Sequence, residues 1–130
     1  MTWYHKGGPR YRVTVKCGAG ALSDGDPAYY SSGLIIAAAD GTAVDVICAE
    51  DMSANTDNYD ADLLIPGSIW QCTVSSQTLV RGTPVAMAGT SNVDGGTAAD
   101  PAIGRVVNAD VASTDTVAEI EILGEASAIA

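Results

Sequence analysis

Few side chains in this sequence combine into a recognisable catalytic or metal-binding set. The sole histidine, His5, precedes a Gly-Gly-Pro break that we expect to leave it without a rigid partner for acid–base work. Cys17, Cys48 and Cys72 lie 31 and 24 residues apart with no Cys-x-x-Cys pair, so we expect buried structural thiols rather than a zinc site. The sequence therefore predicts no catalytic residue, no cofactor and no metal. A small hydrolase that uses a pair of carboxylates is a further hypothesis. It is not specific, because any chain with 16 acidic residues contains candidate pairs.

The segment from residue 49 to residue 62 is polar and acidic, with no period of two or 3.6 residues. Asp57, Asp60 and Asp62 resemble an oxygen-rich calcium loop, but the glycine and the bidentate glutamate of an EF-hand are missing. We therefore expect an exposed, solvated loop. Tyr59 within it is either a surface contact residue or a ring that folds back over the end of a barrel.

Charge is divided unevenly along the chain. The 130 residues carry a net charge of -10, but residues 1–16 hold four basic residues and no acid, giving +4. Residues 17–130 hold two basic residues against all 16 acidic ones, giving -14. Such an acidic body argues against direct binding of nucleic acid. The longest apolar run, residues 34–39, is far shorter than the ~20 residues of a membrane span, so no membrane partner is expected either.

The basic segment is also rich in aromatic residues. Because Gly-Gly-Pro interrupts regular structure, we predict an extended N-terminal arm over residues 1–10, outside the core, and a barrel domain over residues 11–130. Aromatic and arginine side chains are enriched at interfaces, so the arm is predicted to bind a partner. The candidate contact residues are Trp3, Tyr4, His5, Lys6, Arg10, Tyr11 and Arg12. Two alternatives are a disordered terminus of no consequence and an arm docked on a neighbouring copy.

The rest of the chain is typical of a β protein. Val, Ile and Thr total 32 residues against six Leu, and turn residues separate short alternating segments. Hairpins are predicted for 34–39 with 43–48, around Asp40-Gly41, and for 63–65 with 69–74, around Pro66-Gly67. The fold predicted is a compact, single-domain, all-β barrel. Its strands are expected at residues 11–16, 34–39, 43–48, 63–65, 69–74, 77–80, 83–88, 104–108 and 116–123.

Three stretches between Gly25 and Leu123 carry a resemblance to a known family. They are Gly25-Asp26, the segment DGTAVDVICAED at 40–51, and the C-terminal group VRGTPVA at 80–86, AIGRVV at 102–107 and EIEI at 119–122. This pattern resembles the small β-barrel or β-tulip decoration (cement) proteins of tailed-phage capsids.

The resemblance implies a structural protein without catalytic residues. It would be made in the host cytoplasm and would bind the outer surface of the virion, where it stabilises the expanded shell. The implied partner is the major capsid protein, contacted through the N-terminal arm, and the implied assembly is a homotrimer, with a dimer as the alternative. A hypothesis of another class is a virion-surface module that recognises a host glycan or receptor through loop 49–62.

Overall fold

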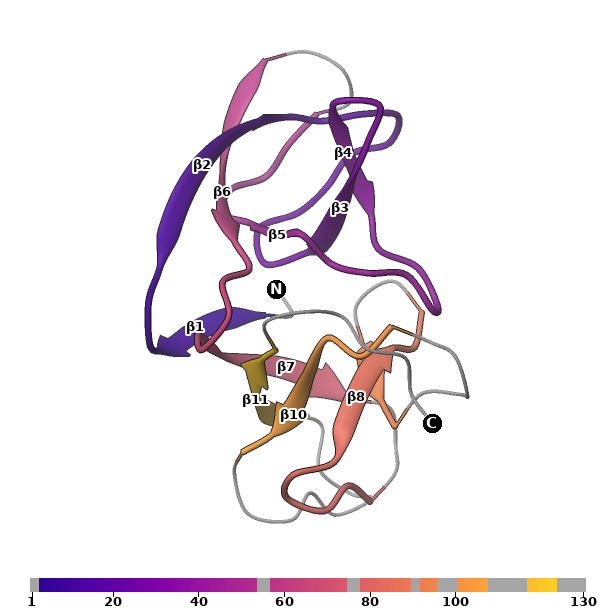
Figure 1. The fold of residues 1–130 in the computed structure, drawn as a ribbon. Coiled ribbons are helices and arrows are strands. Elements are labelled where there is room, and N and C mark those ends of the chain that lie inside the picture. Colours follow the sequence, from indigo (N-terminus) through magenta and orange to yellow (C-terminus); the bar gives the residue numbers. More distant parts are fainter. Residues whose placement is uncertain are drawn as a thin grey trace.

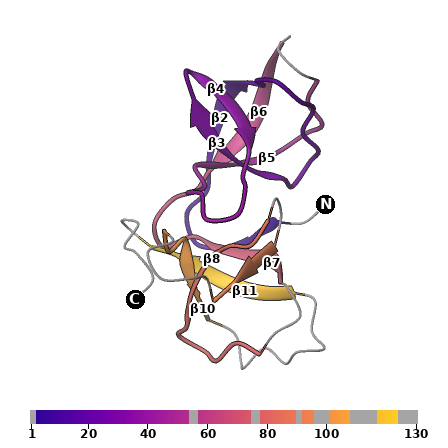
Figure 2. The same ribbon diagram turned by 90° about the vertical axis from the view of Figure 1, so that its right-hand side faces the viewer.

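The chain crosses twice between two β-sheets that form the two lobes of the molecule (Figures 1 and 2). The computed structural model describes residues 3–53, 57–74, 78–89, 92–95, 101–107 and 117–123. The upper lobe contains β2 (Tyr11–Lys16), β3 (Pro27–Ser31), β4 (Leu34–Ala37), β5 (Val46–Cys48) and β6 (Asn58–Leu63). The lower lobe contains β1 (Tyr4–Gly7), β7 (Ile69–Val74), β8 (Pro84–Met87), β9 (Asn92–Asp94), β10 (Gly104–Val106) and β11 (Val117–Ile122).

The lower lobe is a closed barrel with one additional strand. Its sheet has the order β1-β7-β11-β10-β8-β9, and a parallel pairing of β9 with β7 closes the ring of five strands. β7 buries Trp70, Cys72 and Val74 on one face because its apolar residues alternate with half-buried ones. β11 follows the same rule, so the barrel interior fills with side chains from both strands.

The upper lobe is a five-stranded antiparallel sheet of order β2-β6-β5-β3-β4 that curls round on itself. A parallel bridge between Cys17 and Ile35 brings the end of β2 beside β4. The Gly18 amide donates to the Ile35 carbonyl at 2.8 Å at this point. A Cβ on Gly18 would lie 2.9 Å from Cγ2 of Ile36, so this close approach requires glycine.

Both predicted hairpins are wrong. Strands are found at 34–37, 46–48 and 69–74, but of the strand predicted at 63–65 only Leu63 lies in a strand, as the last residue of β6. β4 pairs with β3 through a tight turn at Ser32-Gly33, where both residues have positive φ (52° and 82°) as a two-residue hairpin turn demands. β5 pairs with the other edge of β3 and with β6. The turn at Asp40-Gly41 instead extends to the lower lobe, where the Gly41 amide donates a hydrogen bond to the Met87 carbonyl.

The segment around Pro66-Gly67 connects the two lobes rather than two paired strands, since β6 belongs to the upper sheet and β7 to the lower one.

The structure of the acidic segment 49–62 also differs from the predicted exposed loop. Residues 58–62, expected in an exposed loop, form most of β6, which pairs with β2 on one side and β5 on the other. Residues 78–80 form no strand, only a bridge at Leu79, and Gln77 and Thr116 lie outside the described residues.

The arm prediction is wrong for residues 3–10. β1 pairs antiparallel with β7, and Trp3 is only 1% exposed and belongs to the core cluster of the lower lobe. The Trp3 amide also donates to the Gly25 carbonyl at 3.2 Å. Gly-Gly-Pro does end β1, as expected, but the break lets the chain turn from the lower lobe into β2. At Gly8, where φ is +74°, an added Cβ would lie 2.5 Å from the Gly67 carbonyl oxygen.

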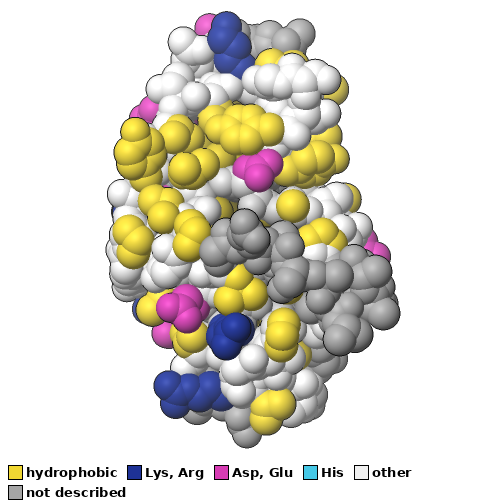
Figure 3. All heavy atoms as spheres, viewed as in Figure 1, with side chains coloured by type: hydrophobic (Ala, Val, Ile, Leu, Met, Phe, Trp, Pro, Cys, Tyr) yellow, Lys and Arg dark blue, Asp and Glu magenta, His cyan; other side chains and the backbone are white. Residues whose placement is uncertain are grey.

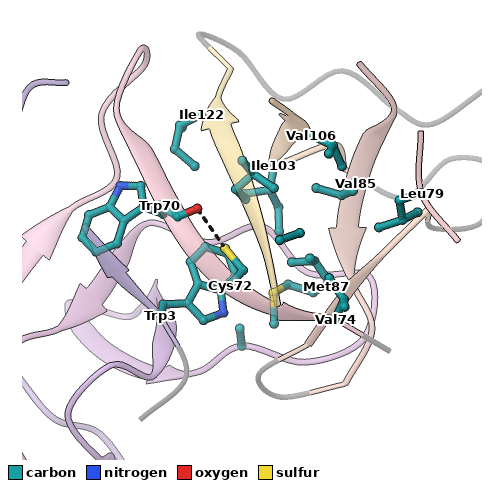
Figure 4. Packing of buried hydrophobic residues seen from close by; sticks show 14 of the residues in the cluster. Trp3, Trp70, Cys72, Val74, Leu79, Val85, Met87, Ile103, Val106 and Ile122 are labelled. Atoms are coloured by element: carbon teal, nitrogen blue, oxygen red, sulfur yellow. Dashed lines mark hydrogen bonds between the residues drawn. The ribbon is translucent and has the colours of Figure 1, made fainter. Parts of the chain in front are cut away.

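The hydrophobic core joins the two lobes. The lower cluster, part of which is drawn in Figure 4, includes Trp3 and Trp70 and extends to Ala38 and Ile47 of the upper lobe. A second cluster fills the upper sheet around Ile35. The described residues contain strands and turns and no helix, so the prediction of an all-β, compact, single-domain barrel fold is confirmed.

Candidate interface at the N-terminal strands

A cleft of about 220 Å³ opens where β1 and β2 meet the junction of the two lobes. Its walls contain five of the seven residues proposed from sequence as contact residues, namely Trp3, Tyr4, His5, Arg10 and Arg12. The other two lie beside it in the chain: Lys6 is exposed, and Tyr11 is 60% exposed. The structure therefore brings the predicted set together, on an ordered surface instead of a free arm.

The centre of the cleft is a carboxylate held by two arginines. Arg10 donates from Nε and Nη2 to Oδ2 of Asp62 at 3.2 and 3.0 Å, and Arg12 donates from Nε to Oδ1 at 2.9 Å. Asp62 is 3% exposed, whereas the two arginine side chains are about half exposed, at 51% and 47%. The pair of cations thus rests on a buried anion and keeps part of its donor surface toward solvent.

Electrostatics at this cluster favour the charged forms. Burial alone would raise the pKa of Asp62, but hydrogen bonds from Arg10 and Arg12 and their positive charges outweigh it, and the pKa lies below its ordinary value. The hydrogen bond to Asp62 in turn raises the pKa of Arg12. Arg12 also lies 3.8 Å from Asp60, which is exposed.

Aromatic rings form the floor of the cleft. His5 packs edge-on against Trp70, with ring centroids 5.4 Å apart, and its Nε2–H donates to the Gly8 carbonyl at 3.1 Å. The expectation that nothing holds His5 is therefore wrong. Nε1 of Trp70 donates to the Ser68 hydroxyl at 3.0 Å. Both tryptophans are 1% exposed, so neither offers a surface ring, and Tyr4, 39% exposed with Lys6 Nζ 5.6 Å above its ring, is the exposed aromatic side chain of β1.

The buried partner Asp62 was missed as a site residue. It lies in the acidic stretch whose charge suggested a solvated loop, and the alternation Asp60-Ala61-Asp62 was its only signal of a strand. On β6, Ala61 faces the upper core while Asp60 and Asp62 face Arg12 of β2. Acidic residues at alternate positions of a strand can therefore indicate ion pairs with a neighbouring strand as well as a solvated face.

Tyr59 is not a free surface ring. It is half-buried, packs against the upper core cluster, and its hydroxyl accepts from the Ser53 amide at 3.2 Å. This packing favours the role of a ring that folds back on the protein over that of a surface contact residue, although Tyr59 lies within β6, opposite Val15, and not at the end of the barrel. Residues 54–56 of the predicted loop lie outside the described residues.

The thiols are buried, as expected for structural cysteines. Cys17, Cys48 and Cys72 are all free and buried. Desolvation, with a contribution from the Asp26 carboxylate, raises the pKa of Cys48 to about 12, and burial raises the pKa of Cys72 well above its ordinary value. The described residues contain no group of three or more His, Cys, Asp or Glu arranged for a metal ion.

A second cleft of about 220 Å³ lies on the junction between the lobes, lined by aliphatic residues, two prolines and Asp45. The Asp45 carboxylate already accepts from the Tyr30 amide at 2.8 Å. On the face drawn in Figure 3, hydrophobic side chains gather over the upper lobe, and the Lys and Arg side chains visible on this face lie outside that group. No helix in the described ranges is long and apolar enough to cross a membrane.

This arrangement defines a fold class: a closed five-stranded barrel joined through a shared core to a curled five-stranded sheet. No protein-family model and no curated protein matches the sequence. Among solved structures, the chain is similar to the head fibre gp8.5 N base of bacteriophage phi29, with a TM-score of 0.65 and 14% sequence identity over 92% of this chain and 98% of that chain. At this identity, the similarity demonstrates a common fold.

Proposed function

We propose that this protein is a structural component of a bacteriophage virion that binds the outside of the assembled head and stabilises the shell. The observation that carries the proposal is the fold shared with the base of a phage head fibre over 92% of the chain. The motifs between Gly25 and Leu123 that resemble capsid decoration proteins support the same role. Fold similarity alone does not define a function, so the binding surface is argued separately.

The surface proposed to bind the major capsid protein is the N-terminal face formed by β1 and β2. It contains four of the six basic residues of the chain, and its exposed side chains include Tyr4, Lys6 and Tyr11. Exposed aromatic rings beside positive charges are typical of interface anchors. Trp3 is excluded as a direct anchor by its burial, and its role is to hold β1 on the barrel.

A homotrimer suits this function, because several N-terminal faces would then engage neighbouring capsid subunits together and gain affinity by multivalency. Binding only to the assembled, expanded shell stabilises that state by linkage. The acidic remainder of the chain, at -14, then faces solvent and keeps decorated heads from associating.

The test is binding of the full-length protein to expanded empty shells that lack it, measured by co-sedimentation. We expect saturable binding and a higher temperature of shell disruption. The double variant Lys6→Glu/Tyr11→Ala is expected to lose binding while remaining folded, and Arg105→Glu, at the exposed residue of β10 in the lower lobe, is the charge-matched control. Absence of wild-type binding to expanded shells would refute the proposal. Deleting residues 1–10 is not a clean test, because it removes Trp3 from the core.

A role in glycan recognition through loop 49–62 has less support. Stacking on a sugar needs an exposed ring, and Tyr59 is half-buried with its hydroxyl engaged by Ser53. The position of this ring therefore favours a structural role.

A further inference from the structure

Among the described residues, one edge of β2 has no strand beside it until β2 approaches β4 at its C-terminal end. In the upper sheet, β2 is the terminal strand and pairs only with β6 from Tyr11 to Lys16. Beyond its end, Cys17 and Gly18 meet Ile35 of β4, and this contact closes the sheet. β2 runs along the left margin of the upper lobe in Figure 1. An edge of this kind can accept an additional strand.

The direction of the backbone groups follows from the pairing of β6. The Asp60 carbonyl accepts from the Ala49 amide, and the Asp60 amide donates to Glu50, so both groups point away from β2. Asp60 lies opposite Thr14 in the antiparallel register. In such a pair the backbone groups of both residues point away from each other, so the amide and carbonyl of Thr14 face the free edge.

The same alternation places the backbone groups of Arg12 and Lys16 on the same side of β2, because they are two residues to either side of Thr14. The Gly18 amide confirms this direction, since it points to β4 along the same edge. Arg12, Thr14 and Lys16 are all exposed. The edge thus presents two amide and carbonyl pairs, at Arg12 and Thr14, with Val13 hydrogen-bonded to β6 between them. The Lys16 backbone lies where β2 meets β4 at the Cys17–Ile35 bridge and is not part of the free edge.

Charge identifies what this edge fits. Lys16 is exposed at one end, while Arg10 and Arg12, which share the buried Asp62, stand half-exposed at the other. Exposed Asp60 lies 3.8 Å from Arg12, so the three basic side chains outnumber the two carboxylates that pair with them. Basic side chains along an edge repel a second copy of the same edge, but they attract an acidic strand. The exposed ring of Tyr11 supplies an apolar contact at the same end.

We propose that the free edge of β2 binds an extended acidic segment of the capsid protein by strand addition. Backbone hydrogen bonds at Arg12 and Thr14 supply the pairing, and the side chains of the arginine pair and Lys16 select for negative charge. This inference rests on the proposed capsid-binding function and specifies the partner's chemistry at that surface.

The test compares Thr14→Pro with Thr14→Val in the full-length protein. Proline removes one edge amide and is tolerated on an edge strand when its nitrogen faces outward, so the ladder to β6 is preserved, while valine keeps the amide. We expect Thr14→Pro to bind expanded shells on the order of tenfold more weakly than Thr14→Val, with equal unfolding midpoints. A Lys16→Glu variant is also expected to bind more weakly.

Hydrogen exchange gives a readout specific to strand addition. On shell binding, the amides of Arg12 and Thr14 are expected to become protected, while those of Val13 and Val15 are protected in both states. Equal shell binding by both Thr14 variants, with no new protection, would overturn strand addition and leave the proposed function standing. A change in oligomeric state of Thr14→Pro without loss of shell binding would overturn it in favour of a second copy. Failure of the wild type to bind shells would overturn the proposed function itself.

Discussion

Arg10 and Asp62, 52 residues apart, are joined by two hydrogen bonds to a single carboxylate oxygen, at 3.2 and 3.0 Å. Arg12 occupies the other oxygen at 2.9 Å. The arginines lie at the start of the upper lobe, immediately after the turn that leaves β1, and Asp62 lies near the end of β6. The cluster therefore fixes the segment that connects β1 to β2 onto the upper sheet.

Replacing Asp62 with asparagine should destabilise the protein by about 1–3 kcal/mol, because the amide keeps one acceptor oxygen but loses the charge that both guanidinium groups contact. Because the half-exposed arginines are partly hydrated, the loss of stability should be smaller than for a fully buried ion pair. Urea unfolding at pH 7 measures this difference. Asp60→Asn, at an exposed position with a 3.8 Å contact, is the matched control and should change stability by less than about 0.5 kcal/mol.

The same pair predicts a pH dependence. The pKa of Asp62 is lower in the folded protein than its ordinary value of 3.8, so the folded state favours the ionised form. The resulting stabilisation is complete above the ordinary pKa and is lost as pH falls through the lowered one. The stability gap between wild type and Asp62→Asn should therefore be constant from pH 7 to about pH 5 and shrink below about pH 4. A gap that widens on acidification would contradict this assignment.

Trp3→Ala should cost about 3–5 kcal/mol, because it empties a fully buried site in the core of the lower lobe. Since such a loss can unfold a small domain outright, Trp3→Phe provides a milder second variant that should remain folded with lower stability. Tyr4→Ala, on the neighbouring and 39% exposed residue, is the control and should have a small effect. Equal stability of the Trp3 and Tyr4 alanine variants would show that β1 does not dock in solution.

Gly8→Ala should destabilise by about 1–3 kcal/mol, because a side chain at φ +74° is strained and its Cβ would meet the Gly67 carbonyl at 2.5 Å. Gly7→Ala is the matched control, since a Cβ on Gly7 meets open space among the described residues. Thermal unfolding of both variants separates the two positions. A destabilisation of Gly7→Ala as large as that of Gly8→Ala would argue against the close approach of the two turns.

The three thiols should be unreactive in the native protein. With a pKa of about 12, only about one Cys48 in ten thousand is a thiolate at pH 8, and all three side chains are buried. A thiol-specific chromogenic reagent should therefore react with almost no thiol over minutes in buffer. After unfolding in urea, it should detect three thiols per chain. Rapid modification of a single thiol in buffer would show local opening of the sheet around it.

The strands with clean alternation could be predicted from sequence: β2 and β7 begin and end at the predicted residues. Their partners could not. Asp40-Gly41 indicates a reversal of the chain, but the partner of each strand depends on which edges are free, and β3 fills the position between β4 and β5. β6 was missed because Asp60 and Asp62 look solvated until the arginines about 50 residues earlier are placed beside them.

The seven residues of the candidate interface were recognised by composition and charge, but their surroundings were not. Composition marks which side chains suit a contact, whereas burial depends on the rest of the fold. Gly-Gly-Pro illustrates the difference: the same break that suggests a detached arm is the turn that allows Trp3 to reach the lower core.

Because β1 belongs to a lobe whose other described strands all come from residue 69 onward, β1 cannot pair with β7 until that later part of the chain has left the ribosome. The upper sheet, formed by residues 11–63, can assemble first from neighbouring segments. Trp3 meanwhile lacks the lower-lobe residues that make up most of its core cluster. Its full burial in the lower core is thus a late step of folding, and a bulky fusion placed before Trp3 would interfere with that step more than with assembly of the upper sheet.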